Sequence, residues 1–166
     1  MGVPPSDAYG RLVRRGRRLA ALGGGLASAA SFGAIYGLFG MILDSPFNWV
    51  LPVAACLVSA VAAPLLWGLL APGGGRFRIG LGTLSGVLTA LLAHIGLGIA
   101  AYAVFLLDPS LVSRSASPAQ TPIAYDAAMA GGTVVLSLAI GWSITLPLGA
   151  LYALLVTLHC RARARR

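Results

Sequence analysis

Long apolar runs and short polar segments alternate along the whole chain of 166 residues. Apolar residues dominate four stretches, at residues 19–43, 49–71, 79–107 and 122–159. The hydrocarbon core of a bilayer is about 30 Å thick, so a helix that rises 1.5 Å per residue needs roughly 20 apolar residues to cross it. Each run is long enough. The pattern therefore predicts an all-α membrane protein with four transmembrane helices in a compact bundle over residues 19–159.

The fourth run is too long for one span perpendicular to the membrane. It begins with Thr121-Pro122, an N-cap residue followed by proline at the first helical position. The pair Gly131-Gly132 follows nine residues later. We therefore expect residues 121–130 to form a short interfacial helix or an extension at the membrane edge, with a joint at the two glycines and a span over residues 131–158.

The arginines indicate which way the chain crosses the membrane. All twelve basic residues are Arg, and eleven lie in the tails, 1–18 and 160–166, or in the turn that holds Arg76 and Arg78. The other two loops hold only Arg114. Loops on the cytoplasmic side carry the excess of Lys and Arg. The distribution predicts a multi-pass protein of the bacterial inner membrane with both termini cytoplasmic.

Composition sets the class of protein and of partner. Hydrophobic residues make up 58% of the chain and charged residues 10%, whereas soluble domains carry about 25% charged residues. The net charge of +8 lies beside the apolar runs, and there is no soluble segment long enough to form a nucleic-acid surface. We expect the partners to be the lipid bilayer and other membrane subunits or a second copy, with no nucleic acid.

Small residues recur at four-residue spacing in each run, which is typical of closely packed helices in a bilayer. The first run contains such a row, and the second has one from Cys56 to Gly68. The predicted helix-packing glycines are Gly33, Gly37, Gly82, Gly86, Gly98, Gly141 and Gly149.

His94 lies near the centre of the third run and within its row of small residues. Ionisable side chains are costly inside a bilayer, so a functional role is the first hypothesis. The alternative is structural, because the fourth run offers hydroxyl partners. Those possible polar partners are Thr133, Ser137, Ser143 and Thr145. A transport role would require a polar cavity or pore that reaches His94.

A cofactor is a third possibility for His94. The spacing Ala90-x-x-x-His94 resembles the pigment-binding spacing of bacterial light-harvesting polypeptides, which implies a single axial ligand to a pigment. A haem held by two histidines would need a second one at the same depth. His159 lies at the end of its run, roughly 20 Å from the midplane. We expect no cofactor, no metal and, because Cys56 and Cys160 differ in depth, no disulfide.

Groups for catalysis are sparse in the apolar runs. The middle of each run lacks Asp, Glu, Lys and Arg. We therefore expect no enzymatic activity and favour a small non-catalytic subunit or assembly partner of a larger membrane complex. The alternatives are a small transporter or channel that uses the midplane His94, and a subunit that binds pigment or haem.

Overall fold

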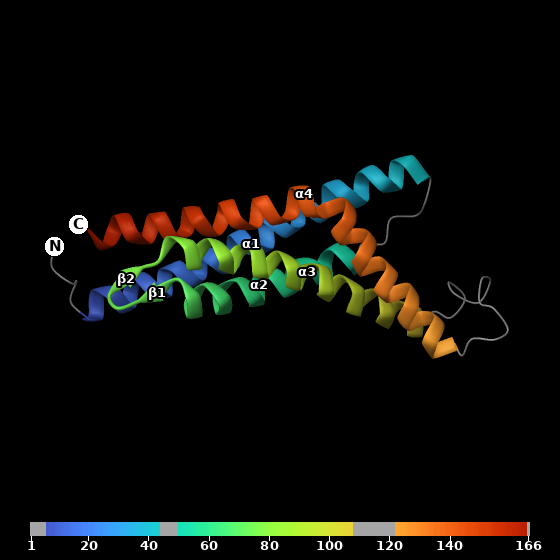
Figure 1. Ribbon diagram of the computed structural model, residues 1–166, viewed down its shortest axis with the longest axis horizontal. Coiled ribbons are helices and arrows are strands. Elements are labelled where there is room, and N and C mark those ends of the chain that lie inside the picture. The colour runs from blue at the N-terminus through green and yellow to red at the C-terminus, as the bar shows by residue number, and fades with distance from the viewer. Residues whose placement is uncertain (1–5, 44–49, 108–121, 166) are drawn as a thin grey trace.

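The computed structural model describes residues 6–43, 50–107 and 122–165 and is built from four helices (Figure 1). These are α1 (Ser6–Leu43), α2 (Val50–Leu70), α3 (Ile79–Leu107) and α4 (Pro122–Ala164). The strands β1 (Pro72–Gly73) and β2 (Arg76–Phe77) form a short antiparallel ribbon between α2 and α3. The prediction of an all-helical bundle is confirmed, with this ribbon as the addition.

Three segments are long and apolar enough to cross a membrane, as far as the described residues show. They are Val50–Leu70, Ile79–Val104 and Gly141–Ala164. Val50–Leu70 has 21 residues, which corresponds to a helix of about 32 Å and matches the thickness of a hydrocarbon core. These segments support a multi-span membrane protein. A fourth span over residues 19–43 stays a prediction.

Two boundaries differ from those expected. Helix α1 begins at Ser6, so its five arginines lie on helical turns that continue directly into the apolar part, where we expected a separate tail over 1–18. Helix α4 runs without interruption through Gly131-Gly132, where we expected a joint. It bends near its middle instead (Figure 1). Pro147 lies inside α4 and lacks the N–H that would bond to the preceding turn, a common cause of such a bend.

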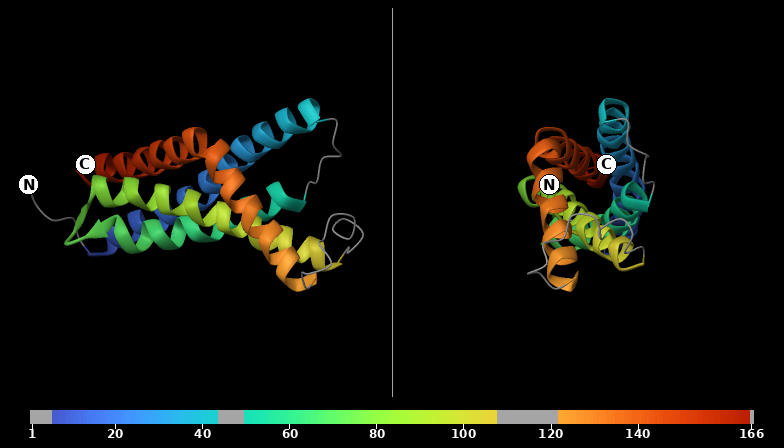
Figure 2. Two further views of the ribbon diagram at one scale, coloured as in Figure 1. Left: turned by 45° about the vertical axis from the view of Figure 1, so that its right-hand side comes forward. Right: turned by 90° about the vertical axis from the view of Figure 1, so that its right-hand side faces the viewer.

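The start of α1, the β1–β2 ribbon and the end of α4 meet at one end of the bundle (Figures 1 and 2). Gly74 and Gly75, both with positive φ, make the tight turn of the ribbon. An aromatic cluster then joins the elements. The ring centroids of Trp67 and Phe77 are 5.8 Å apart, and those of Tyr9 and Phe77 are 5.3 Å apart.

At the opposite end the helices separate. The second half of α1 and the first segment of α4 diverge from each other in both views of Figure 2. Contacts are densest between α3 and α4 and between α1 and α2. The four helices are therefore held together mainly at the end that carries the arginines and in the middle of the bundle.

Most large aliphatic side chains lie on the outside, whereas the interior consists mainly of small or hydroxyl-bearing residues, with a few large side chains such as Trp67, Phe32 and Leu97. On α2 the exposed residues form a continuous stripe from Val50 and Val53 through Leu57 to Leu69. The opposite face buries Ala55, Ser59 and Ala63, among others. An exterior of this kind is suited to lipid chains rather than to water.

Candidate functional site

His94 is completely buried on α3, between α1 and α4. Its ring nitrogen Nδ1 lies 2.9 Å from Oγ of Ser137, and Nε2 lies 2.9 Å from Oγ1 of Thr145. On the side of α1, the ring meets Phe32 edge-on, with the centroids 5.0 Å apart. Side chains from two neighbouring helices thus enclose the imidazole.

The two hydroxyl partners of His94 come from different parts of α4. Its apolar residues fall into two segments, Ala127–Ala139 and Gly141–Ala164. Ser137 lies in the first and Thr145 in the second. On a straight helix these residues would be about 12 Å apart along the axis. By binding both hydroxyls, His94 connects α3 to each segment of the bent helix.

The hydrogen-bond geometry allows the protons around His94 to be counted. The hydroxyl of Ser137 lies 3.0 Å from the carbonyl oxygen of Val134, and that of Thr145 lies 2.8 Å from the carbonyl oxygen of Gly141. Each hydroxyl has one proton, and a neutral imidazole offers one donor and one acceptor. With a neutral ring, one hydroxyl donates to the ring and gives up its carbonyl. Only a doubly protonated ring would satisfy all four contacts, at the cost of a charge buried among apolar residues.

The other two predicted partners lie elsewhere. The hydroxyl of Thr133 donates to the carbonyl oxygen of Met129, one turn earlier in the same helix, at 2.9 Å. Ser143 is exposed on the outside of α4. The structure therefore brings Ser137 and Thr145 to His94 and leaves Thr133 and Ser143 apart from it.

Some of the predicted packing glycines lie at contacts between helices, and others do not. Gly86 and Gly149 meet backbone to backbone, and a Cβ added at Gly149 would lie 2.7 Å from the carbonyl oxygen of Gly86. Gly82 lies against Thr157, Gly98 lies against Val134, and Gly141 is buried. Gly33 and Gly37, in contrast, have no described atom within 4 Å of an added Cβ.

On α1 and α2, the residues that pack between the helices form a row shifted by one position in the sequence from the predicted row of small residues. The buried residues of α1 include Gly16, Ala20, Gly24 and Ser28, and those of α2 include Ser59. Gly24 lies directly against Ala63, with an added Cβ 2.7 Å from the Cβ of that residue. The predicted rows at Gly33 and Gly37, and from Cys56 to Gly68, lie beside this face.

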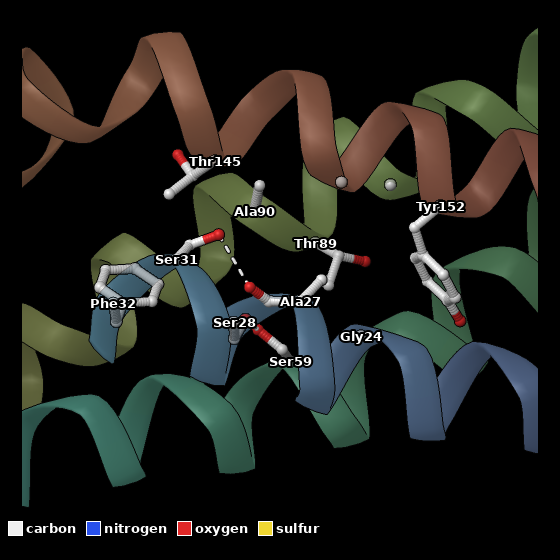
Figure 3. A pocket seen from close by; sticks show the side chains of 12 residues that line it. Gly24, Ala27, Ser28, Ser31, Phe32, Ser59, Thr89, Ala90, Thr145 and Tyr152 are labelled. Atoms are coloured by element: carbon white, nitrogen blue, oxygen red, sulfur yellow. Dashed lines mark hydrogen bonds between the residues drawn. The ribbon is translucent and has the colours of Figure 1, made fainter. Parts of the chain in front are cut away.

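A small cavity lies next to this site, between α1 and α4 (Figure 3). Its volume is about 20 Å³, which is room for about one water molecule. Hydroxyl groups from all four helices line it, including those of Ser31, Ser59, Thr89 and Thr145. The cavity reaches Thr145 but is far too small for a channel.

Sequence reasoning missed the hydroxyl residues on the first three helices. Ser28 and Ser59 share a buried hydrogen bond between α1 and α2. Ser85 and Thr89 donate to backbone carbonyls of α3, at 2.6 and 2.8 Å. Every buried side-chain nitrogen and oxygen in the described part of the chain has a partner. Hydroxyl residues spaced four apart beside a glycine row, as in Ser85 and Thr89, are the signal that could have found this interior.

The arrangement offers little for chemistry. Both ring nitrogens of His94 have hydrogen-bond partners, so neither is available as a metal ligand without rearrangement. Within the described ranges, no three His, Cys, Asp or Glu side chains lie together in a way that could hold a metal ion. Cys56 and Cys160 are both free thiols.

Comparisons with protein-family models, with curated proteins and with solved structures found no match to this chain.

Proposed function

We propose that this chain is a four-span protein of the bacterial inner membrane, with both termini cytoplasmic, that serves as a non-catalytic subunit or assembly partner of a larger membrane complex. The enclosure of His94 is the observation that carries the proposal. Both ring nitrogens of His94 are in hydrogen-bond contact with hydroxyl groups of a neighbouring helix. A role in helix packing therefore accounts for the buried histidine.

Orientation and the fourth span are supported by the arginine-bearing end of the bundle. Ten described arginines come from the start of α1, from Arg76 and Arg78, and from the end of α4. Arginines on the same side of the membrane favour a cytoplasmic location for that side. The apolar part of α1 then crosses beside α2, since Gly24 and Ser28 pack against the α2 residues Ala63 and Ser59.

The transport alternative has less support. It needs a polar route to His94, but the ring is fully buried and the adjacent cavity has a volume of about 20 Å³. The pigment or haem alternative needs a free ring nitrogen. A visible absorption band in the purified protein would revive the cofactor role and count against a purely structural His94.

The subunit role can be tested with photo-crosslinking amino acids placed on exposed positions of different helices. Suitable positions are Leu26 on α1, Ile99 on α3 and Leu151 on α4, all of which are exposed. A subunit with a defined interface should give one discrete crosslinked product, in native membranes, from one of these faces only. Purification in mild detergent should return the same partner in fixed ratio. Recovery of this chain alone, without crosslinks at any face, would contradict the proposal.

A further inference from the structure

An open groove runs along the outer surface of α2 and α3 within the membrane-spanning part. Its walls are aliphatic side chains of α2 between Leu57 and Leu69, together with Leu92 of α3. The groove has a volume of about 650 Å³. It follows α2 for about 18 Å. Its lining residues carry no polar side chain, so its occupant within the membrane must be apolar over this length.

At the arginine-bearing end of α2, a guanidinium lies beside this groove. The side chain of Arg17 crosses Gly68, with its Nε, Cζ and Nη2 atoms in the space that a Cβ on residue 68 would need. Gly68 directly precedes Leu69, the last groove residue of α2. Arg17 itself is exposed. Because Gly68 has no side chain, the guanidinium can lie directly on the surface of α2.

The packing of α1 on α2 fixes the depth of Arg17. The indole of Trp67 covers Gly16, and Ala63 contacts Gly24, so the two helices run antiparallel. Arg17 therefore lies level with the last turn of the candidate span Val50–Leu70. Headgroup phosphates lie at this depth, just outside the hydrocarbon core. The groove begins at the same level and continues toward the membrane centre.

Charge at this end favours an anion. Five arginines of α1, Arg76 and Arg78, the α4 residues Arg161 and Arg163, and Arg165 just after α4 gather there. The acidic residue of the described sequence at this end is Asp7. A guanidinium binds a phosphate through charge-assisted and often bidentate hydrogen bonds.

We infer that Arg17 and the α2–α3 groove form a binding site for one anionic phospholipid of the surrounding bilayer, with its phosphate on Arg17 and an acyl chain in the groove. The ligand must combine an anion with a long apolar chain, because the two parts of the site lie at different depths. A soluble polyanion would leave the groove empty. The inference needs only that α2 and α3 cross the membrane, and it does not depend on the proposed subunit role.

Native mass spectrometry of the full-length protein in detergent can test the site. Phosphatidylglycerol and phosphatidylcholine with identical chains are titrated in parallel, and the affinity for each is read from the bound fraction. We expect tighter binding of phosphatidylglycerol. R17Q should weaken it about tenfold, as expected for one lost charge-assisted contact. R18Q removes the same charge one residue later and points elsewhere, because successive helical residues turn by about 100°, so it should have little effect.

Two further variants, each with a control, test the position of the Arg17 guanidinium and the groove without changing the net charge. G68A keeps every arginine but puts a Cβ where the Arg17 guanidinium lies, and it should weaken phosphatidylglycerol binding. G80A, with open space around residue 80, is its control. V61W fills the groove and should also weaken binding, whereas L155W on the exposed face of α4 should not.

The inference is overturned by any of four results. The first is equal affinity for the two lipids, and the second is equal losses in R17Q and R18Q. The third is binding that is unchanged in G68A and V61W. The fourth is displacement of the bound lipid by inorganic phosphate or an oligonucleotide as effectively as by phosphatidylglycerol. That last pattern would identify a diffuse polyanion surface.

Discussion

The Nε2 atom of His94 on α3 lies 2.9 Å from Oγ1 of Thr145 on α4. This hydrogen bond spans two helices whose remaining contacts are largely between glycines, alanines and hydroxyl residues. Because lipid offers no hydrophobic drive for helix association, such polar contacts and close packing hold the pair together. The predictions below test these contacts separately.

Replacing Thr145 by valine keeps the shape of the side chain and removes the hydroxyl. We expect T145V to destabilise the bundle by about 0.6–2 kcal/mol, the range for hydrogen bonds between membrane helices. Unfolding in mixed detergent micelles measures the change. T133V is the matched control, since the Thr133 hydroxyl donates within α4, to the carbonyl oxygen of Met129. Equal effects of the two variants would show that His94 does not use Thr145.

Adding a methyl group at Gly149 should force α3 and α4 apart. The new Cβ would lie 2.7 Å from the carbonyl oxygen of Gly86 and 3.3 Å from the Cβ of Ala90. We expect a loss of about 1–3 kcal/mol for G149A, as for other overpacked interiors.

The same helix supplies the control for that variant. Gly132 has open space around it, so G132A should be neutral or stabilising by up to about 1 kcal/mol, because alanine is the better helix former. If both variants behave alike in the unfolding assay, the close approach of Gly86 and Gly149 is not present in the protein.

Alkaline pH should loosen the contact between α1 and the ribbon. The Tyr9 hydroxyl donates to the carbonyl oxygen of Arg76 at 3.0 Å, and burial raises the pKa of the Tyr9 phenol above its ordinary value of 10.0. The folded state therefore favours the neutral phenol. Its contribution to stability is complete below pH 10 and is lost as the pH rises through the raised pKa.

The measurement is the difference in thermal midpoint between the unmodified protein and Y9F. It should be constant from pH 7 to about 10 and shrink above that range. A difference that stays constant to higher pH would mean that the Tyr9 hydroxyl forms no such contact.

Cysteine labelling tests the proposed orientation. In a C56A/C160A background, S115C falls in the sequence between α3 and α4, and A162C lies on the exposed last turns of α4. A membrane-impermeant maleimide should label S115C in intact cells and A162C only after the cells are opened. The reverse pattern would place both termini outside.

The apolar runs predicted the helices well because a bilayer demands long, nearly uncharged segments. The points at which helices begin, end or break were harder to predict from the sequence. Continuous α-helix satisfies the backbone through the arginines of α1 and through Gly131-Gly132, so neither polarity nor a glycine pair stops a helix there. The pattern of glycines did not indicate the bend of α4, for which Pro147 within the helix supplies a common cause.

The interior was predictable on α3 and only partly on the other helices. The predicted row from Gly82 to Gly98 is buried at each of its positions, and a second row with Ser85 and Thr89 is buried beside it. On α1, Gly24-Gly25 and Ser28-Ala29 offer two rows one residue apart, and composition cannot distinguish them. The choice follows from which row meets Ala63 and Ser59 on α2. Sequence alone does not provide that register.

The close approach of Gly86 to Gly149 also bears on how this sequence can diverge. Interior positions of this kind have no room for a larger residue, whereas exposed positions outside the groove, such as Leu22 and Leu155, tolerate other apolar side chains. Over time the exterior should drift freely among Leu, Ile, Val and Phe, while the spaced small residues stay fixed. Relatives of this chain are then expected to share a sparse periodic set of glycines and hydroxyl residues around one histidine, with little identity between them.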